Sequence, residues 1–218
     1  LIVVLEIMTM AFASLTLYKQ SHYQDPQEHA PSAEQIKDAR LAPQIYLIIS
    51  HASTAFLLVA SLLLAQRAAS FSFDDFRQHA GSLSQGRATI IFLLALTGLG
   101  IRAGLTPAHF WVSLVHPASP TTTHAFSLGI AIKVAIYLMI RFFFQFLEPQ
   151  VGWGYLLLGV AVITAVVNVW YAIASHDLKK ALAYHSIENV GIIVAGVGAA
   201  IVFHASGMAA LAILALTA

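Results

Sequence analysis

The sequence contains no cysteine and few charged residues. Without cysteine the chain can form no disulfide and can supply no thiolate to zinc or to an iron–sulfur cluster. We therefore expect it to bind no cofactor. Only 10% of the residues are charged, against about a quarter in a soluble domain. The formal net charge of +1 provides no strongly basic surface, so we do not expect nucleic acid as a partner.

Long apolar stretches fill most of the chain, and 59% of its 218 residues are hydrophobic. Apolar stretches of about 18–25 residues are long enough to cross a bilayer as helices. We predict an all-α, polytopic bundle of transmembrane helices, one of them discontinuous, in an integral membrane protein. The seven expected membrane segments lie near residues 1–18, 43–66, 88–105, 121–146, 153–174, 183–204 and 207–218.

Both ends of the sequence lie within apolar runs, LIVVLEIMTM at the start and GMAALAILALTA at the end. The first run lacks the basic start and the small-residue cleavage site of a signal peptide. We expect residues 1–218 to be the central part of a longer membrane domain. The polar residues 19–42 are expected to form a loop with a short surface helix. Asp177 is expected to cap a helix that begins at Leu178.

Several ionisable residues fall within the expected membrane segments. A central Arg, Lys or Asp costs at least about 2.5–3.5 kcal/mol there, and such residues usually pair, face a wet cavity or carry a function. We take these positions as the candidate proton path: Glu6, His51, Arg102, Lys133, His185 and Glu188.

Each candidate also has a purely structural interpretation. Burial of Lys133 would favour its neutral form and let it exchange a proton, but it could also form a static ion pair between helices. Glu6 could carry a proton, pair with a cation or lie at headgroup depth. His51 could relay protons or make a hydrogen-bonded helix contact. His185 and Glu188 share a helix face and could both lie at the interface.

The stretch PAHFWVSLVHPASPTTTH at 107–124 combines three prolines with three histidines. Proline interrupts a helix, and broken helices occur at membrane depth where they line a cavity or are buried in protein. We expect the broken helix to involve Pro107, His109, His116, Pro117 and Pro120. The sequence has no HxxxH or HxH pair, so we expect no metal site.

The run RAGLTPAHFWVSLVHPASPTTTHAFSLGIAIKVAIYLMIR resembles the signature of the antiporter-like membrane subunits. This family includes proton-pumping subunits of respiratory complex I, Mrp-type cation/proton antiporter subunits and relatives in group 4 membrane-bound hydrogenases. Its signature is a basic residue, then proline five positions later, His–x–Trp, His–Pro–x–x–Pro, and a mid-helix Lys and Tyr. HPASP, SHDLKKALAYHSIENVG and HASTAFLLVASLLL are most similar to the hydrogenase-4 and formate hydrogenlyase branch.

The resemblance implies roles for individual residues. Glu6, in LEIMTM, matches the essential helix glutamate, and Lys133 matches the central bridging lysine. His51 matches a histidine of this branch, and His185 and Glu188 fall in its His–Ser–Ile–Glu motif. In the family, protons or cations move along such residues, driven by redox chemistry in partner subunits. The implied partners are other membrane subunits, a hydrogenase-like or NADH dehydrogenase-like peripheral arm and the lipid bilayer of a prokaryotic inner membrane.

Arg102 departs from this pattern, because the family places at this position a lysine that pairs with the glutamate. Arginine has a pKa above about 12 and effectively keeps its proton. Arg102 could therefore pair with Glu6 but could not transfer a proton itself. Three functions remain open: a redox-driven proton-translocating subunit, a structural membrane anchor with an inactive channel, and a cation/proton antiporter subunit that carries H⁺ or Na⁺.

Overall fold

The computed structural model describes residues 2–22, 33–68 and 72–217, and within these ranges the chain is almost entirely helical, with no strand. The α-helices are α1 (Ile2–His22), α2 (Ala33–Ala68), α3 (Phe73–Gln78), α4 (Gln85–Ala103), α5 (Phe110–Ala118), α6 (Thr121–Phe126), α7 (Ile132–Arg141), α8 (Val151–Ala174), α9 (Leu178–Ala205) and α10 (Ala209–Thr217). Shorter turns are the 3₁₀ turn η1 (Ala80–Ser82) and the π-turns η2 (Ser127–Ala131) and η3 (Phe142–Phe146).

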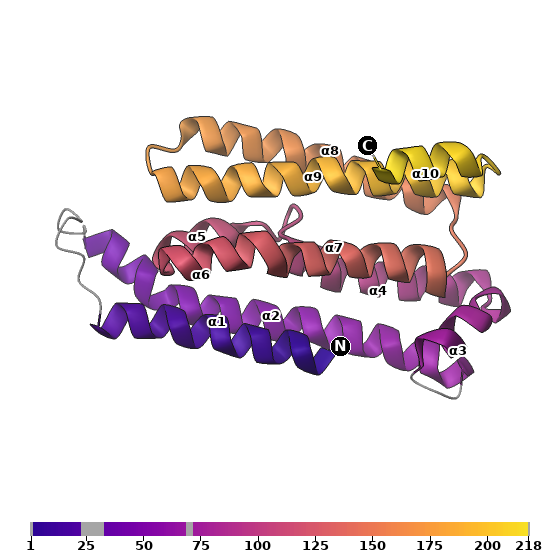
Figure 1. Cartoon of the computed structure of the whole chain (residues 1–218), viewed down its shortest axis with the longest axis horizontal. Helices are drawn as coiled ribbons and strands as arrows, with labels where there is room; N and C mark the ends of the chain where they lie inside the picture. Colours follow the sequence, from indigo (N-terminus) through magenta and orange to yellow (C-terminus); the bar gives the residue numbers. More distant parts are fainter. Residues whose placement is uncertain (1, 23–32, 69–71, 218) are drawn as a thin grey trace.

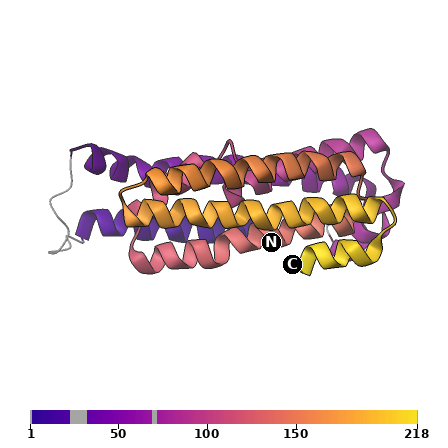
Figure 2. The same ribbon diagram turned by 90° about the horizontal axis from the view of Figure 1, so that it is seen from above.

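The long helices run side by side in three layers (Figure 1). One layer holds α1 and α2, which contact each other, and the next holds α4 and α5 together with α6 and α7. The third is the hairpin of α8 and α9, with α10 against α9. Figure 2 shows the same bundle from above, with the hairpin lying over the middle layer. The bundle therefore places α4 and α5 between the first helices and the hairpin.

Helix length and hydropathy confirm the predicted class of helical membrane protein. Helices long and apolar enough to cross a membrane occur at Leu41–Gln66, Gln85–Ala103, Gly129–Phe146, Val151–Ala174 and Leu178–Ala205. The first predicted segment contains the shorter apolar stretch Val3–Tyr18, and the last coincides with α10. The five long segments are thus accounted for among the described residues, whereas the count of seven stays a prediction.

The described part of the polar stretch at 19–42 differs from the expected loop and short surface helix. Helix α1 continues to His22, and α2 begins at Ala33 and runs without a break through Pro43 into the membrane span. The sequence AEQIKDARLA is rich in strong helix formers, which explains why the helix extends in front of the span. Residues 23–32 of that stretch lie outside the described residues.

The segment predicted at 121–146 is not one regular helix. It divides into α6, η2, α7 and η3, so that a π-turn lies at each end of α7. A π-turn inserts an extra residue into the helical repeat, and such turns are frequent at functional sites. Lys133 is the second residue after η2, so the π-turn helps to set the direction in which its side chain leaves the helix.

The α8–α9 hairpin is packed through glycines. A Cβ atom at Gly191 would lie 2.8 Å from the backbone nitrogen of Ala165, and one at Gly198 would lie 3.0 Å from that of Leu158. Small residues let transmembrane helices approach this closely, so that the backbones themselves are in contact. The hairpin turn ends where the Asp177 carboxylate accepts a hydrogen bond of 3.0 Å from the backbone N–H of Lys180, which confirms the predicted cap.

Candidate functional site

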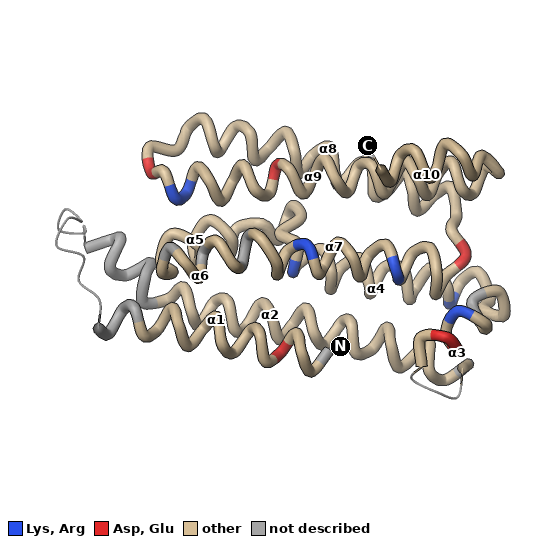
Figure 3. Tube along the Cα trace, viewed as in Figure 1, with Lys and Arg blue, Asp and Glu red and all other residues tan. Residues whose placement is uncertain are grey.

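The structure brings Glu6 of α1 and Arg102 of α4 together inside the bundle. Arg102 is buried, with 7% of its surface exposed, and its Nη2 lies 3.5 Å from Oε1 of Glu6. Few charged positions occur along the middle of the helices (Figure 3). A buried charge of this kind is costly unless it is paired and hydrogen-bonded, so the surroundings of the pair decide whether it is stable.

Arg102 occupies the last turn of α4, just before the helix breaks. Gly104 ends this helix with φ of 77°, a left-handed conformation that favours glycine. The carbonyl of Gly100 accepts a hydrogen bond of 2.8 Å from the backbone N–H of Leu105, which closes the end of the helix. A cation in the last turn interacts favourably with the carbonyl end of a helix. The helix break therefore offers a favourable position for a fixed positive charge.

Two threonine hydroxyls hold the guanidinium group in place. Nη2 of Arg102 donates to Oγ1 of Thr54 at 2.9 Å, and Nη1 donates to Oγ1 of Thr9 at 3.2 Å. The hydroxyl of Thr54 in turn donates to Oε1 of Glu6. The sequence analysis missed both threonines, although Thr9 follows Glu6 by three residues and Thr54 follows His51 by three. Helical spacing of three places such pairs on one face, and this signal could have found them.

His51 of α2 lies on the other side of the Glu6 carboxylate. Its Nε2 is 3.5 Å from Oε2 of Glu6, and its Nδ1 is 2.7 Å from the backbone carbonyl of Leu47. The His51 side chain is 50% exposed, whereas that of Glu6 is 24% exposed. Glu6 therefore lies between a buried guanidinium group and a half-exposed imidazole.

An aromatic layer adjoins this polar group. Tyr46 is buried, interacts by side-chain hydrogen bonds with Thr9 and Ser50, and faces the charge of Arg102. Its ring lies 4.7 Å from that of Phe12 and 5.4 Å from that of Trp111, measured between centroids.

His116 continues the layer. It is fully buried, and its ring lies 5.9 Å from that of Phe12 and 5.8 Å from that of Trp111. The structure thus places His116 in the aromatic layer rather than beside the carboxylate of Glu6.

The predicted broken helix is present between α4 and α5. The hydroxyl of Thr164 on α8 accepts a hydrogen bond of 3.0 Å from the backbone N–H of Thr106, and Trp111 Nε1 donates across the break to the carbonyl of Ile101 at 2.9 Å. His109 lies beside the break, with its ring 6.0 Å from that of Tyr171. These contacts satisfy backbone groups that the break would otherwise leave without partners.

The three prolines of this region differ in their positions. Pro107 lies in the break itself, Pro117 lies inside α5, and Pro120 lies directly before α6. Pro107 and Pro120 therefore mark boundaries of regular helix, as the absence of a backbone N–H in proline predicts.

Lys133 and the His185–Glu188 pair occupy α7 and α9. Lys133 is exposed, so within the described part of the chain it is not buried as expected. It lines a small cavity of about 80 Å³ together with Ser186 and Asn189 of α9. Nδ1 of His185 lies 2.8 Å from Oε2 of Glu188, on the same helix. Ionisable side chains therefore also occur on α7, in the middle layer, and on α9, in the hairpin.

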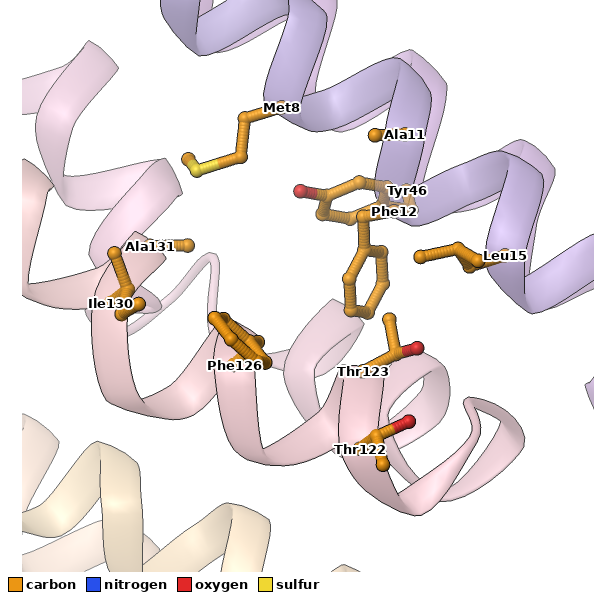
Figure 4. Close-up of a pocket in the computed structure, with 10 residues that line it drawn as sticks. All are labelled: Met8, Ala11, Phe12, Leu15, Tyr46, Thr122, Thr123, Phe126, Ile130 and Ala131. Carbon is orange, nitrogen blue, oxygen red and sulfur yellow. The ribbon is translucent and has the colours of Figure 1, made fainter.

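A larger, mostly apolar cavity of about 390 Å³ lies between α1, α2 and the segment formed by α6 and η2. Figure 4 shows Phe12 and Tyr46 on one side of it, facing Phe126 and Ile130 on the other. Tyr46 lines this cavity and also interacts with Thr9, so it adjoins both the apolar cavity and the Glu6–Arg102 group.

Comparison with known proteins agrees with this architecture. Residues 32–217 match the family described as "NADH:quinone oxidoreductase/Mrp antiporter, TM". The chain belongs to this family. The predicted resemblance is thereby confirmed, and the chain is an antiporter-like membrane subunit sequence in an integral membrane protein.

Curated relatives in the family include two proteins of Escherichia coli K12. Hydrogenase-4 component B is 37% identical over 174 residues, which make up 78% of this chain and 25% of the relative. Formate hydrogenlyase subunit 3 is 30% identical over 158 residues, 72% of this chain and 26% of the relative. The chain thus spans about a quarter of the length of each relative.

Solved structures show the same fold. The Mrp complex from Dietzia sp. DQ12-45-1b superposes with a TM-score of 0.77 at 20% identity, covering 98% of this chain and 39% of that one. The membrane-bound sulfane sulfur reductase, an archaeal respiratory membrane complex, gives 0.74 at 21% identity, covering 98% and 35%. At this level of identity the likeness concerns the fold alone.

Proposed function

We propose that this chain is the central part of a membrane subunit that moves protons, coupled to redox chemistry in partner subunits. The observation that carries the proposal is the position of Glu6, a titratable carboxylate within the bundle between Arg102 and His51. The family, and relatives such as hydrogenase-4 component B, support a complex of the hydrogenase or NADH dehydrogenase type. Its partners are other membrane subunits, a peripheral redox arm and the lipids of a prokaryotic inner membrane.

In this proposal Glu6 is the group that gains and loses the proton. Arg102 supplies a constant positive charge because arginine keeps its proton at any physiological pH. His51 takes up or delivers the proton, since histidine is the side chain best suited to change charge in this range. A carboxylate between a fixed cation and a titratable imidazole can thus be loaded and unloaded without moving a second permanent charge.

Lys133, His185 and Glu188 continue the path toward α7 and α9. The cavity beside Lys133 is lined by the polar side chains of Ser186 and Asn189, which suit a water molecule that carries protons. The break between α4 and α5, at Pro107 and His109, places Arg102 at the end of a discontinuous helix, and such helix ends form ion sites in other transporters.

One observation favours a second function, a structural membrane anchor. Arg102 is buried and held by hydroxyls of two helices, which is the arrangement expected of a static helix contact. In the anchor, Glu6 stays ionised and the pair only joins α1 to α4. An independent antiporter that carries H⁺ or Na⁺ is a third function, and the Mrp fold likeness supports it only at the level of the fold.

The decisive experiment uses the complete assembly in sealed proteoliposomes. Redox turnover and internal pH are followed together in the wild type and in the Glu6→Gln and Lys133→Ala variants, and Lys179→Ala, outside the proposed path, is the control. If turnover continues while acidification falls in both path variants, the subunit conducts protons. If acidification is unchanged in both, the anchor is correct. Acidification that requires external Na⁺ and persists without redox turnover would support the antiporter.

A further inference from the structure

The Arg102 guanidinium reaches the Glu6 carboxylate chiefly through a hydroxyl. Nη2 lies 2.9 Å from Oγ1 of Thr54 but 3.5 Å from Oε1 of Glu6, and the Thr54 hydroxyl contacts that same carboxylate oxygen. The shorter of the two guanidinium contacts is therefore the one to threonine. Thr54, a neutral side chain, therefore sets the distance between the two charged groups of the ion pair.

The direction of each hydrogen bond in this group is fixed by chemistry. A guanidinium group only donates, so Thr54 and Thr9 must both accept from Arg102. Each threonine then sends its own hydroxyl hydrogen elsewhere: Thr54 to Glu6, and Thr9 to the backbone carbonyl of Leu5 at 2.9 Å. The contact between Arg102 and Thr9 does not involve the carboxylate, so it persists when Glu6 becomes neutral.

The position of Thr54 is itself fixed by close packing of α2 against α4. The hydroxyl of the neighbouring Ser53 donates to the backbone carbonyl of Gly98 at 2.7 Å, and both Ser53 and Gly98 are buried. A Cβ at Gly98 would lie 2.9 Å from the carbonyl oxygen of Ser53, so only glycine permits this approach. Thr54 therefore faces Arg102 from a helix that has little freedom to shift.

The ring of His51 is oriented for exchange with Glu6. Nδ1 lies 2.7 Å from the carbonyl of Leu47, and because a carbonyl can only accept, Nδ1 carries a hydrogen. In the neutral ring Nε2 is then the nitrogen without hydrogen, and it faces Oε2 of Glu6 at 3.5 Å. Thus a proton on Glu6 can pass to Nε2 without a change of tautomer.

We propose that Thr54 is a positioning residue: its hydroxyl holds Arg102 at a constant place beside Glu6, so that His51, and not Arg102, exchanges the proton with Glu6. In the exchange, the O–H bond of protonated Glu6 breaks and an N–H bond forms at Nε2 of His51, leaving a carboxylate and an imidazolium. The hydrogen on Nδ1 stays bonded to Nδ1 and continues to be donated to the Leu47 carbonyl. The inference rests on the proposed function, which assigns roles to Glu6, Arg102 and His51, and it adds the role of Thr54.

The test compares two threonines inside membrane helices, the part-buried Thr54 and the buried Thr16, which differ in what they touch. Thr54→Val removes the bridging hydroxyl, while Thr16→Val is the control, because Thr16 is fully buried and its hydroxyl donates to the backbone carbonyl of Phe12 at 2.9 Å. In proteoliposomes that hold the complete assembly, Thr54→Val should lower protons moved per turnover by about tenfold or more, since small displacements of reacting groups have effects of this size. Thr16→Val should stay within about twofold of the wild type, and Thr54→Ser should restore most of the loss.

A second readout separates positioning from loss of structure. The infrared carbonyl band of protonated Glu6, identified by its absence in Glu6→Gln, should shift in Thr54→Val and return toward the wild-type frequency in Thr54→Ser. Thr54→Ala replaces Thr54→Val if the valine variant does not assemble. Proton movement and a band that are the same in Thr54→Val and Thr16→Val would overturn the inference, as would failure of serine to restore them.

The same series separates this inference from the proposed function. If Glu6→Gln moves protons as the wild type does, the proposed function itself is wrong. If Glu6→Gln loses proton movement while Thr54→Val keeps it, proton conduction stands and only the role of Thr54 is wrong. His51→Gln should match the loss in Glu6→Gln, and normal proton movement in His51→Gln would contradict the exchange step.

Discussion

The α8–α9 hairpin is packed through glycine backbones, whereas α1, α2 and α4 meet through hydroxyl groups around an ion pair. In the hairpin, Gly191 and Gly198 bring the two backbones into contact. Around Arg102, the contacts are hydrogen bonds that the guanidinium donates to the hydroxyls of Thr9 and Thr54. Backbone contacts permit one arrangement only, but hydrogen bonds between hydroxyls and charges can be exchanged when a proton arrives. Glycine contacts therefore hold the hairpin alone, whereas around Arg102 one such contact, at Gly98, is combined with hydrogen bonds that can be exchanged.

The largest loss of stability is expected from Gly191→Leu, which disrupts the glycine contact between α8 and α9. A Cβ there meets the backbone of Ala165 at 2.8 Å, and the backbone cannot move aside as a side chain would. Overpacking costs typically about 1–3 kcal/mol and occasionally more, and we expect the upper end or beyond. Heat resistance of the protein in detergent measures the loss. Gly159→Leu on α8 is the control, because a Cβ at Gly159 would meet nothing within 4 Å, and equal losses in both variants would contradict the packing account.

Arg102→Gln should cause the next largest loss of stability, because it removes the ion pair between α4 and α1. Removing one partner of a buried ion pair costs about 3–5 kcal/mol, because the other charge stays behind unpaired. We expect the lower end of this range, since Glu6 is 24% exposed and can become protonated. Unfolding by sodium dodecyl sulfate in mixed micelles measures the change in free energy. The double variant Glu6→Gln/Arg102→Gln should recover part of the loss, and equal stability of the single and double variants would show that the pair is not coupled.

Ser53→Ala tests whether one hydroxyl fixes α2 against α4. Its hydrogen bond to the Gly98 carbonyl is buried, and an intramolecular hydrogen bond of this kind contributes about 0.5–1.5 kcal/mol. We expect a loss of about 1 kcal/mol in the same unfolding measurement. Ser14→Ala is the matched control, because the hydroxyl of Ser14 is exposed and donates to the carbonyl of Met10 in its own helix. A loss no greater than that of the control would show that the glycine contact alone holds these helices.

The smallest effect is expected at the turn of the hairpin. Asp177→Ala removes the cap of α9 and should cost about 1 kcal/mol, while Asp177→Asn should cost little because asparagine caps almost as well. Faster hydrogen exchange at the first turn of α9 in the alanine variant is the measurement. Unchanged exchange there would indicate that packing against α8 alone orders the end of the hairpin.

The sequence predicted the features that depend on local chemistry. Apolar length predicted the five long spans, Pro107 predicted the broken helix, and Asp177 predicted the start of α9. Each of these follows from residues that are neighbours in the chain. The sequence also predicted that Arg102 could pair with Glu6, although 96 positions separate them, because the family signature includes both positions.

Features that depend on contacts between layers were not predicted. The spacing of three from His51 places Thr54 on the same helix face, but it does not show that the Thr54 hydroxyl meets a guanidinium 48 positions away. The π-turns beside α7 were missed for a similar reason, since the sequence there reads as one continuous apolar helix. Lys133 was expected to be buried because it lies at the centre of an apolar run, but burial of a residue is decided by the neighbouring helices.

The permanent charge of Arg102 also bears on which ion can pass. A second unit charge that came within about 5 Å of the guanidinium would be repelled by roughly 3 kcal/mol at an effective dielectric constant of about 20. A sodium ion would have to meet this repulsion as an intact cation. A proton held in a covalent bond of a neutral carboxylic acid approaches Arg102 without net charge. In the proposed function the arginine therefore favours protons over sodium ions, in a place where a lysine that gave up its own proton would lose that discrimination.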